Sequence, residues 1–238
     1  MTQSLIFEAA CPAWLGDRFE PGPTTAWLYR RASARHAIET AYWEGPASPD
    51  GKTHFHDEAQ MVFTISGRRQ FIVRSSLYVV NAGQCLFIPA GQLRRSVPDD
   101  SGPTRCLNLY VPQSNVAALC NALQVGPMTA MEARDVSDVV RRSLIALSDM
   151  GNEFGDVSAL AASFGYSREA FSRKFSRETG VGPAEFSLLV RLNRARALLR
   201  KGDSAAMTAL ECGFADQSHM GRQFLRVFGT SPVQYARA

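Results

Sequence analysis

Two histidines stand one residue apart in the stretch "HFHDEAQ", which runs from His54 to Gln60. On an extended chain the side chains alternate between the two faces, so His54 and His56 point the same way. A β-barrel can present two imidazoles to one metal ion in this manner, but a transition metal needs further ligands from elsewhere in the chain. The spacing therefore raises the question whether the sequence supplies those ligands.

Seven short segments before residue 113 are rich in β-branched and aromatic residues and lie between turn signals. In one of them, Met61, Phe63 and Ile65 fall on the same face of an extended chain. Regularly spaced short strands are typical of a β-sandwich or barrel, which could position the two histidines. The predicted strands are 26–31, 37–45, 60–67, 68–75, 77–83, 84–91 and 105–112.

From about residue 113 the apolar residues recur with the spacing of an amphipathic helix. We therefore expect an all-β domain at residues 1–112, a helical linker at 113–135 and an all-α domain at 136–238. The positions with helical spacing are Val116, Leu119, Cys120 and Leu123, followed by Val136, Val139, Val140, Leu144 and Leu147.

The charge of this chain is distributed unevenly. Its 238 residues are 45% hydrophobic and 20% charged, which is typical of a globular protein with a sizeable core. Residues 1–130 carry 11 Lys and Arg against 10 Asp and Glu, whereas residues 157–238 carry 12 against 6. A basic C-terminal part behind a neutral N-terminal part predicts that the C-terminal part binds a polyanion.

The cysteines and the apolar runs indicate the compartment. Five scattered cysteines, without CxxC spacing, are interpreted as reduced thiols that pack as small apolar groups, with redox sensing as the alternative. No apolar run approaches the roughly 18 residues of a membrane span, and the first twenty residues lack the pattern of a signal peptide. We expect a cytoplasmic protein with no membrane partner.

Residues 160–186 and 208–235 repeat one pattern of helix, Gly-containing turn, helix and Gly-x-x-Pro stop. Gly165 matches Gly213 at an offset of 48, whereas later positions match at an offset of 49, so the second copy has one extra residue in its turn. This pattern is that of the helix-turn-helix, whose second helix lies in a DNA major groove. The later pairs are Arg173 with Arg222, Phe175 with Phe224, Gly180 with Gly229, Pro183 with Pro232 and Phe186 with Tyr235.

A long helix is expected between the two copies, beginning at Pro183 and ending at Gly202. Asp156 and Ser167 are expected to cap the two helices of the first copy. The apolar face of the linking helix is predicted from Leu188, Leu192, Ala195 and Leu199. The remaining surface is expected to carry Arg191, Arg194, Arg196, Arg200 and Lys201.

The double helix-turn-helix, the linking helix and the ending "GTSPVQY" resemble the AraC/XylS family of transcription regulators over about Asp149 to Ala238. The resemblance implies that the two motifs enter successive major grooves on one face of double-stranded DNA. It implies base-edge contacts from one set of side chains and phosphate contacts from another. For each side chain, a solvated or phosphate-facing charge is the alternative. The implied base contacts are Glu169, Ser172, Arg173, Gln217, Ser218 and Arg222, and the phosphate contacts are Lys174, Arg177 and Arg226.

Two residues depart from the pattern of that family. Thr208 stands where the family has a large aliphatic residue, so we expect looser packing of the second motif. Gly221 lies inside a recognition helix and should cost about 1 kcal/mol relative to alanine. It either allows close approach to DNA or merely removes one base contact.

The N-terminal half resembles a cupin, a small β-barrel, over about Trp27 to Val111. The first metal motif of that family has two histidines and, four residues on, an acid; Gln60 stands at the position of the acid. The second motif ends in a histidine, and Arg94 stands at that position. The other motif positions are filled by Gly67, Gly83, Pro89 and Gly91.

The two replacements argue against a metal site. Gln60 is a weak neutral donor, and Arg94 cannot lose its proton to bind a metal ion. We predict no metal, no cofactor and no catalytic residue. An inward Arg94 beside His54, His56 and Gln60 suits a small anionic effector, such as a carboxylate or phosphate. The alternative is that Arg94 points outward, as its neighbour does.

The sequence thus predicts an all-β cupin-like barrel followed by an all-α double helix-turn-helix domain, and a transcription regulator that binds promoter DNA and a small effector. We expect a homodimer, with the helix at 115–123 or the barrel as its interface, unless that helix packs onto its own barrel. RNA polymerase is a further candidate partner. The alternatives are a ligand-independent DNA-binding regulator and a metal-dependent cupin enzyme fused to a DNA-binding module.

Overall fold

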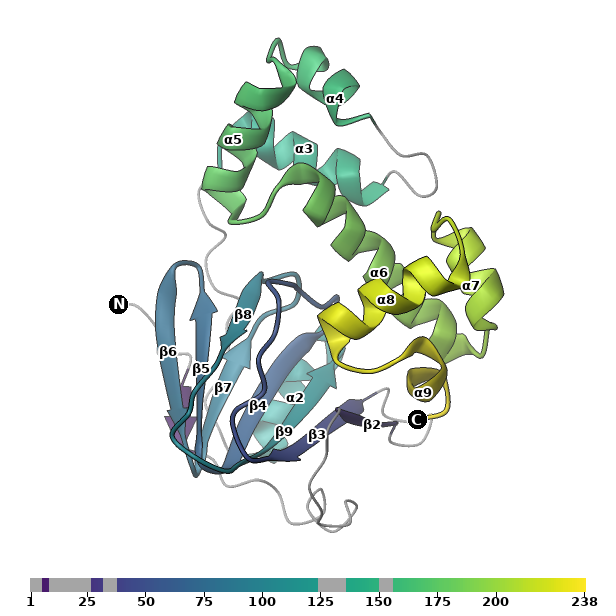
Figure 1. Cartoon of the computed structure of the whole chain (residues 1–238). Helices are drawn as coiled ribbons and strands as arrows, with labels where there is room; N and C mark the ends of the chain where they lie inside the picture. The colour runs from purple at the N-terminus through teal and green to yellow at the C-terminus, as the bar shows by residue number, and fades with distance from the viewer. Residues whose placement is uncertain (1–5, 9–26, 32–37, 124–135, 150–155) are drawn as a thin grey trace. The chain divides into compact units, whose positions relative to one another are not determined.

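A computed structural model of the chain describes residues 6–8, 27–31, 38–123, 136–149 and 156–238 (Figure 1). These residues form two compact units, one built mainly from the chain up to Met131 and one mainly from Glu132 onward. Residues 124–135 of the predicted linker, and also Cys11 and His36, lie outside the described residues.

The first unit contains two antiparallel sheets (Figure 1). The larger has the strand order β1-β7-β4-β9-β3-β2 and the smaller has the order β6-β5-β8. Each of the seven predicted strands is confirmed, and two more, β1 and β8, are found. The strands are β1 (Ile6–Glu8), β2 (Leu28–Arg31), β3 (Glu39–Gly45), β4 (Ala59–Ser66), β5 (Arg68–Val73), β6 (Ser76–Asn81), β7 (Gln84–Ile88), β8 (Arg94–Val97) and β9 (Thr104–Val111).

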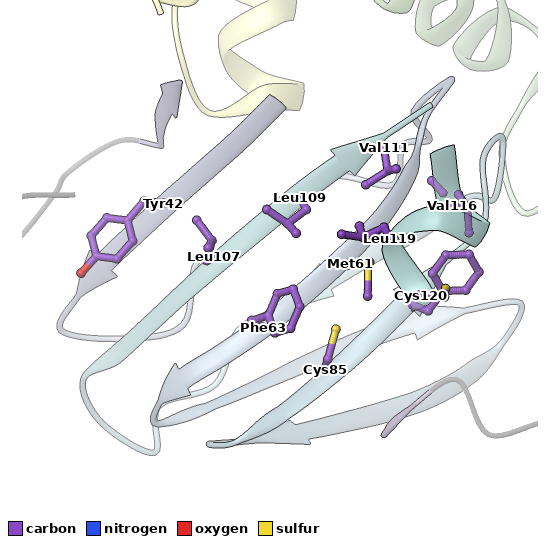
Figure 2. Packing of buried hydrophobic residues seen from close by; sticks show 12 residues of the cluster. Tyr42, Met61, Phe63, Cys85, Leu107, Leu109, Val111, Val116, Leu119 and Cys120 are labelled. Carbon is purple, nitrogen blue, oxygen red and sulfur yellow. The ribbon is translucent and has the colours of Figure 1, made fainter. Parts of the chain in front are cut away.

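One face of the larger sheet is covered by a helix of the same unit, α2 (Val116–Ala122), which follows the short η1 (Gln113–Asn115). Figure 2 shows Val116, Leu119 and Cys120 of α2 above the apolar side chains of the sheet. Of the alternatives for this helix, packing onto its own barrel is the one observed. The buried sheet residues in this cluster are Tyr42, Ala59, Met61, Phe63, Cys85, Phe87, Leu107, Leu109 and Val111.

The other face of the larger sheet points toward the smaller sheet. Val62 of β4 packs there with Phe71 and Val73 of β5. Because side chains alternate along a strand, Gln60 and Thr64 share this inner face with Val62. The same apolar cluster is completed by Val80, Leu86 and Ile88.

The second unit is helical and contains the predicted repeat (Figure 1). The two helices of the first copy have seven and twelve residues, and so do those of the second. Four residues separate the helices of the first copy and five those of the second, which confirms the extra turn residue. The helices are α3 (Asp138–Asp149), α4 (Val157–Ser163), α5 (Arg168–Thr179), α6 (Pro183–Lys201), α7 (Ala205–Glu211), α8 (Gln217–Phe228) and α9 (Pro232–Ala236).

The helix ends follow the expected capping. The side chain of Asp156 accepts a hydrogen bond from the backbone N–H of Ser158, and that of Ser167 accepts one from Ala170. Helix α6 begins at Pro183 and is closed by Gly202, whose φ of 97° is left-handed and favours glycine.

The surface of α6 differs from the prediction at one arginine. Arg196 was expected on the exposed side, but it is fully buried, and its guanidinium lies 5.6 Å from the ring centroid of Tyr235. Arg191 is half-buried and donates to the backbone carbonyl of Gly213 at 2.9 Å. Both arginines therefore bind elements of the second motif to the linking helix. None of the helices in the described ranges has the length and hydropathy of a membrane span.

Candidate functional site

His54 and Arg94 are joined by an isolated antiparallel bridge. The N–H of His54 donates to the Arg94 carbonyl at 3.0 Å, and the N–H of Arg94 donates to the His54 carbonyl at 2.9 Å. The side chain of Arg94 is 3% exposed, whereas Arg95 is exposed. Arg94 therefore points inward, as the effector hypothesis requires, and Arg95 points outward.

His56 and Gln60 lie deeper in the same region. The ring of His56 is buried, with its centroid 4.5 Å from that of Tyr110 and 5.1 Å from that of His54. Gln60 is also buried and stands opposite Tyr110 in the pairing of β4 with β9. The structure thus brings His54, His56 and Arg94 together and places Gln60 next to them through Tyr110.

The donor set at these positions does not fit a cupin metal ion. Nδ1 of His54 lies 2.7 Å from the Lys52 carbonyl, which only accepts, so this nitrogen carries a hydrogen and only Nε2 of this ring could bind a metal ion. Gln60 and Arg94 supply no strong ligand. Within the described ranges, no group of three or more His, Cys, Asp and Glu side chains could hold a metal ion.

Several inner-face residues of the barrel were not singled out from the sequence as binding residues. Glu39 stands opposite Tyr110 in the pairing of β3 with β9, and it is 2% exposed. Arg69, Thr64 and Asn108 are also buried on strands that face the space between the sheets. For Arg69, the alternation of side chains along β5 could have predicted the inward direction, because Phe71 and Val73 lie on the same strand face. By contrast, Phe63 and Phe87 lie on the face that α2 covers.

The first recognition helix, α5, exposes part of the predicted DNA-contacting set. Glu169, Arg173 and Arg177 recur every fourth residue and are exposed, and Ser172 beside them is half-exposed. The buried side of α5 carries Phe171 and Phe175. These three charged side chains therefore lie on one accessible helix face.

Lys174 differs from the other predicted phosphate contacts. Its ammonium lies 2.8 Å from a carboxylate oxygen of Glu178, and Glu178 also accepts from the N–H of Ser137 at 2.8 Å. Burial alone would raise the pKa of Glu178, but the hydrogen bonds from Lys174 and Ser137 outweigh it and lower that pKa to about 2. Lys174 is thus engaged within the helical unit.

The second recognition helix, α8, presents Gln217, Ser218, Arg222 and Arg226 to solvent. Asp216 caps this helix, because its carboxylate accepts from the N–H of His219 at 2.6 Å. A Cβ added at Gly221 would meet no atom within 4 Å, so open space surrounds that position.

Comparisons with known families agree with this architecture. The family described as "AraC-like ligand binding domain" matches residues 37–163, and the family "Helix-turn-helix domain" matches residues 160–238. The chain is 36% identical over 104 residues to the HTH-type transcriptional activator RhaS of Escherichia fergusonii, covering 43% of this chain and 37% of that protein. It is 32% identical over 83 residues to the HTH-type transcriptional regulator MtrA of Neisseria gonorrhoeae, covering 34% and 28%.

Solved structures show a likeness over both units. The crystal structure of ToxT from Vibrio cholerae O395 has a TM-score of 0.55 and 11% sequence identity, covering 84% of this chain and 97% of that one. A structure of ToxT with a bound unsaturated fatty acid has a TM-score of 0.52 and covers 87% and 97%. At this identity the likeness concerns the fold. The match spans 37% of the length of RhaS and 28% of the length of MtrA.

Proposed function

The chain belongs to the AraC family, and from this premise we propose that it is a sequence-specific transcription regulator that binds double-stranded promoter DNA and responds to a small effector. The observation that carries the proposal is the pair of recognition helices, α5 and α8, which belong to one repeat and expose polar side chains. The relatives described above are transcriptional regulators, which favours this function over a cupin enzyme fused to a DNA-binding module.

In the proposed complex Arg173 and Arg222 contact guanine and Gln217 contacts adenine, because these side chains match the base edges bidentately. Glu169 accepts from cytosine, and Ser172 and Ser218 supply shorter polar contacts. Arg177 and Arg226 bind phosphates, and Lys174 contributes less because of its ion pair with Glu178.

DNA binding is tested with duplexes selected by the full-length chain from a random library, at fixed salt. Arg173→Ala and Arg222→Ala should each weaken binding about 5- to 150-fold, which corresponds to roughly 1–3 kcal/mol for a bidentate base contact. Arg141→Ala on α3, which removes an exposed arginine outside both motifs, is the matched control. Selection of no common sequence would contradict sequence-specific binding. A steep loss of affinity with salt in both variants would identify the remaining contacts as phosphate contacts.

The effector is proposed to bind inside the barrel, at the region of His54, His56, Gln60 and Arg94. Support comes from the burial of the last three side chains and from the inward direction of Arg94. In this proposal residues 1–112 form the effector-binding domain, residues 113–135 the linker and residues 136–238 the DNA-binding domain. An effector would act by its different affinity for DNA-competent and DNA-incompetent states.

We further propose that the chain forms a homodimer that occupies paired half-sites, and that it contacts RNA polymerase. The buried side of α2 is already used within the barrel, so a dimer would need other surfaces. Sedimentation of the full-length chain, alone and with the selected DNA, would contradict the dimer if only one copy bound a duplex carrying two sites.

A further inference from the structure

Arg69 is a buried cation between the two sheets. Its side chain is 2% exposed and lies on β5 on the same face as Phe71. Nη2 donates to Ser96 Oγ at 2.9 Å, Nη1 donates to Cys106 Sγ at 3.5 Å, and Nε has no hydrogen-bond partner. The guanidinium lies 4.4 Å from the ring centroid of Phe71 and 5.4 Å from that of Trp27.

The contacts of Arg69 with the described residues leave its charge unbalanced. In the part of the chain that the structure describes, no carboxylate forms an ion pair with it. The Cys106 thiol is not an anionic partner, because burial raises its pKa despite the opposing effect of Arg69. A buried charge is costly when it is not compensated, so an anion is expected beside this guanidinium.

Polar atoms that have no hydrogen-bond partner among the described residues lie along the strands opposite Arg69. Thr64 pairs with Cys106 across β4 and β9, and its hydroxyl has no partner. Two residues along β9 from Cys106, the amide oxygen of Asn108 has none either, and on β4 the amide oxygen of Gln60 has none. These side chains are 2–4% exposed. Buried polar groups are rarely left unpaired, so this row indicates a bound molecule with several polar groups.

We propose that Arg69 binds the carboxylate of a hydroxylated organic acid held between the two sheets, with Thr64 and Asn108 bonding its hydroxyls. A guanidinium binds a carboxylate bidentately, and a hydroxyl both donates and accepts, so it suits an amide and a threonine alike. Asn108 lies about 7 Å along β9 from Cys106, close to the length of an extended six-carbon chain. This assignment rests on the proposed effector-binding function and deepens it, because the anionic group is bound by Arg69 rather than Arg94.

The test uses three probes of equal chain length on the full-length chain: sodium gluconate, sorbitol, which lacks the carboxylate, and sodium hexanoate, which lacks the hydroxyls. Binding is followed by tryptophan fluorescence, since all three tryptophans precede residue 45 and Trp27 lies beside Arg69. Gluconate should bind more tightly than sorbitol and hexanoate. Arg69→Met should weaken gluconate binding at least about tenfold. Arg95→Met, an exposed arginine on the neighbouring strand, should leave it unchanged.

Three results would overturn the assignment: no binding of gluconate, equal binding of sorbitol or hexanoate, or equal gluconate affinity of wild type and Arg69→Met. Should Arg69→Met not fold, Arg69→Lys keeps the charge but loses the bidentate geometry. It should weaken gluconate binding severalfold, and unchanged affinity would count against the proposal. DNA binding of the same samples separates the two proposals. A chain that binds selected DNA but not gluconate contradicts only this inference, and a chain that binds gluconate through Arg69 but no DNA contradicts only the regulator.

Discussion

In the first motif α4 and α5 have seven and twelve residues, and in the second α7 and α8 have the same lengths. The rings of Phe175 and Phe186 lie 5.9 Å apart in the first, and those of Phe224 and Tyr235 lie 5.4 Å apart in the second. The surfaces differ more than the interiors. The first motif has a glutamate at the start of its recognition helix, whereas the second has a glycine inside it. Equivalent packing therefore holds two different sets of polar side chains.

The largest expected effects on stability come from substitutions in the equivalent buried aromatic residues of the two motifs. Phe175→Ala and Phe224→Ala should each lower the free energy of unfolding of the helical unit by about 3–5 kcal/mol, because both rings are fully buried. Urea unfolding followed by circular dichroism at 222 nm reports on the helices, and tryptophan fluorescence reports on the barrel. A loss below about 1 kcal/mol in only one variant would show that the two copies are not packed equivalently.

Thr208 is the place where the interior of the second motif contains an unpaired polar group. Its side chain is fully buried, and its hydroxyl has no hydrogen-bond partner. Thr208→Val should therefore raise the stability of the helical unit by about 1–2 kcal/mol, since it removes an unsatisfied polar group at similar volume. Thr179→Val is the contrasting variant, because that hydroxyl bonds the carbonyls of Phe175 and Val181, and it should lower stability. Equal signs for the two variants would refute this explanation.

Gly221 tests whether the second recognition helix is adapted to DNA at the expense of stability. Gly221→Ala should raise the stability of the helical unit by about 1 kcal/mol, because open space surrounds the added methyl group. Its affinity for the selected duplex then separates the two explanations for the glycine. Weaker binding indicates close approach of the DNA, and unchanged binding indicates that the glycine only omits a contact. No gain in stability would contradict the prediction.

The ion pair of Lys174 and Glu178 belongs to the first motif alone, because its counterparts at the offset of 49 are Gln223 and Val227. The folded-state pKa of Glu178, about 2, is below its usual 4.5. Its contribution is therefore present above pH 4.5 and is lost as the pH falls toward 2. We expect a smaller effect, about 1 kcal/mol after allowance for solvent screening, between pH 7 and pH 3. Glu178→Gln should remove this part of the pH dependence in urea unfolding, and an unchanged profile would contradict the assignment.

Strong periodic signals made much of the fold predictable. Seven segments rich in β-branched and aromatic residues predicted seven strands, whereas β1 and β8, with three and four residues, were not predicted. Strand β8 has the sequence RRSV, so it contains a single β-branched residue and no aromatic one. The repeat located both helix-turn-helix motifs because glycines, prolines and buried aromatic residues recur at fixed offsets.

The candidate sites were less predictable because a side chain's direction depends on packing. Arg196 follows the basic pattern of an exposed face, yet its aliphatic stem and guanidinium are buried against Tyr235. Arg94 left two directions open, and the pairing of its backbone with His54 selects the inward one. Arg69 was not predicted as a site residue because a charged residue in a strand usually faces solvent. Its inward direction becomes evident from Phe71, which lies on the same face of β5 and packs against the other sheet.

The position of α2 has a consequence for how this barrel can change over evolutionary time. The larger apolar cluster of the first unit lies between α2 and the outer face of the larger sheet, away from the inner face that carries Gln60, Thr64 and Asn108. Substitutions at Gln60, Thr64 or Asn108 therefore leave that cluster intact. If the effector binds to this inner face as proposed, ligand preference can diverge while the apolar cluster under α2 is preserved.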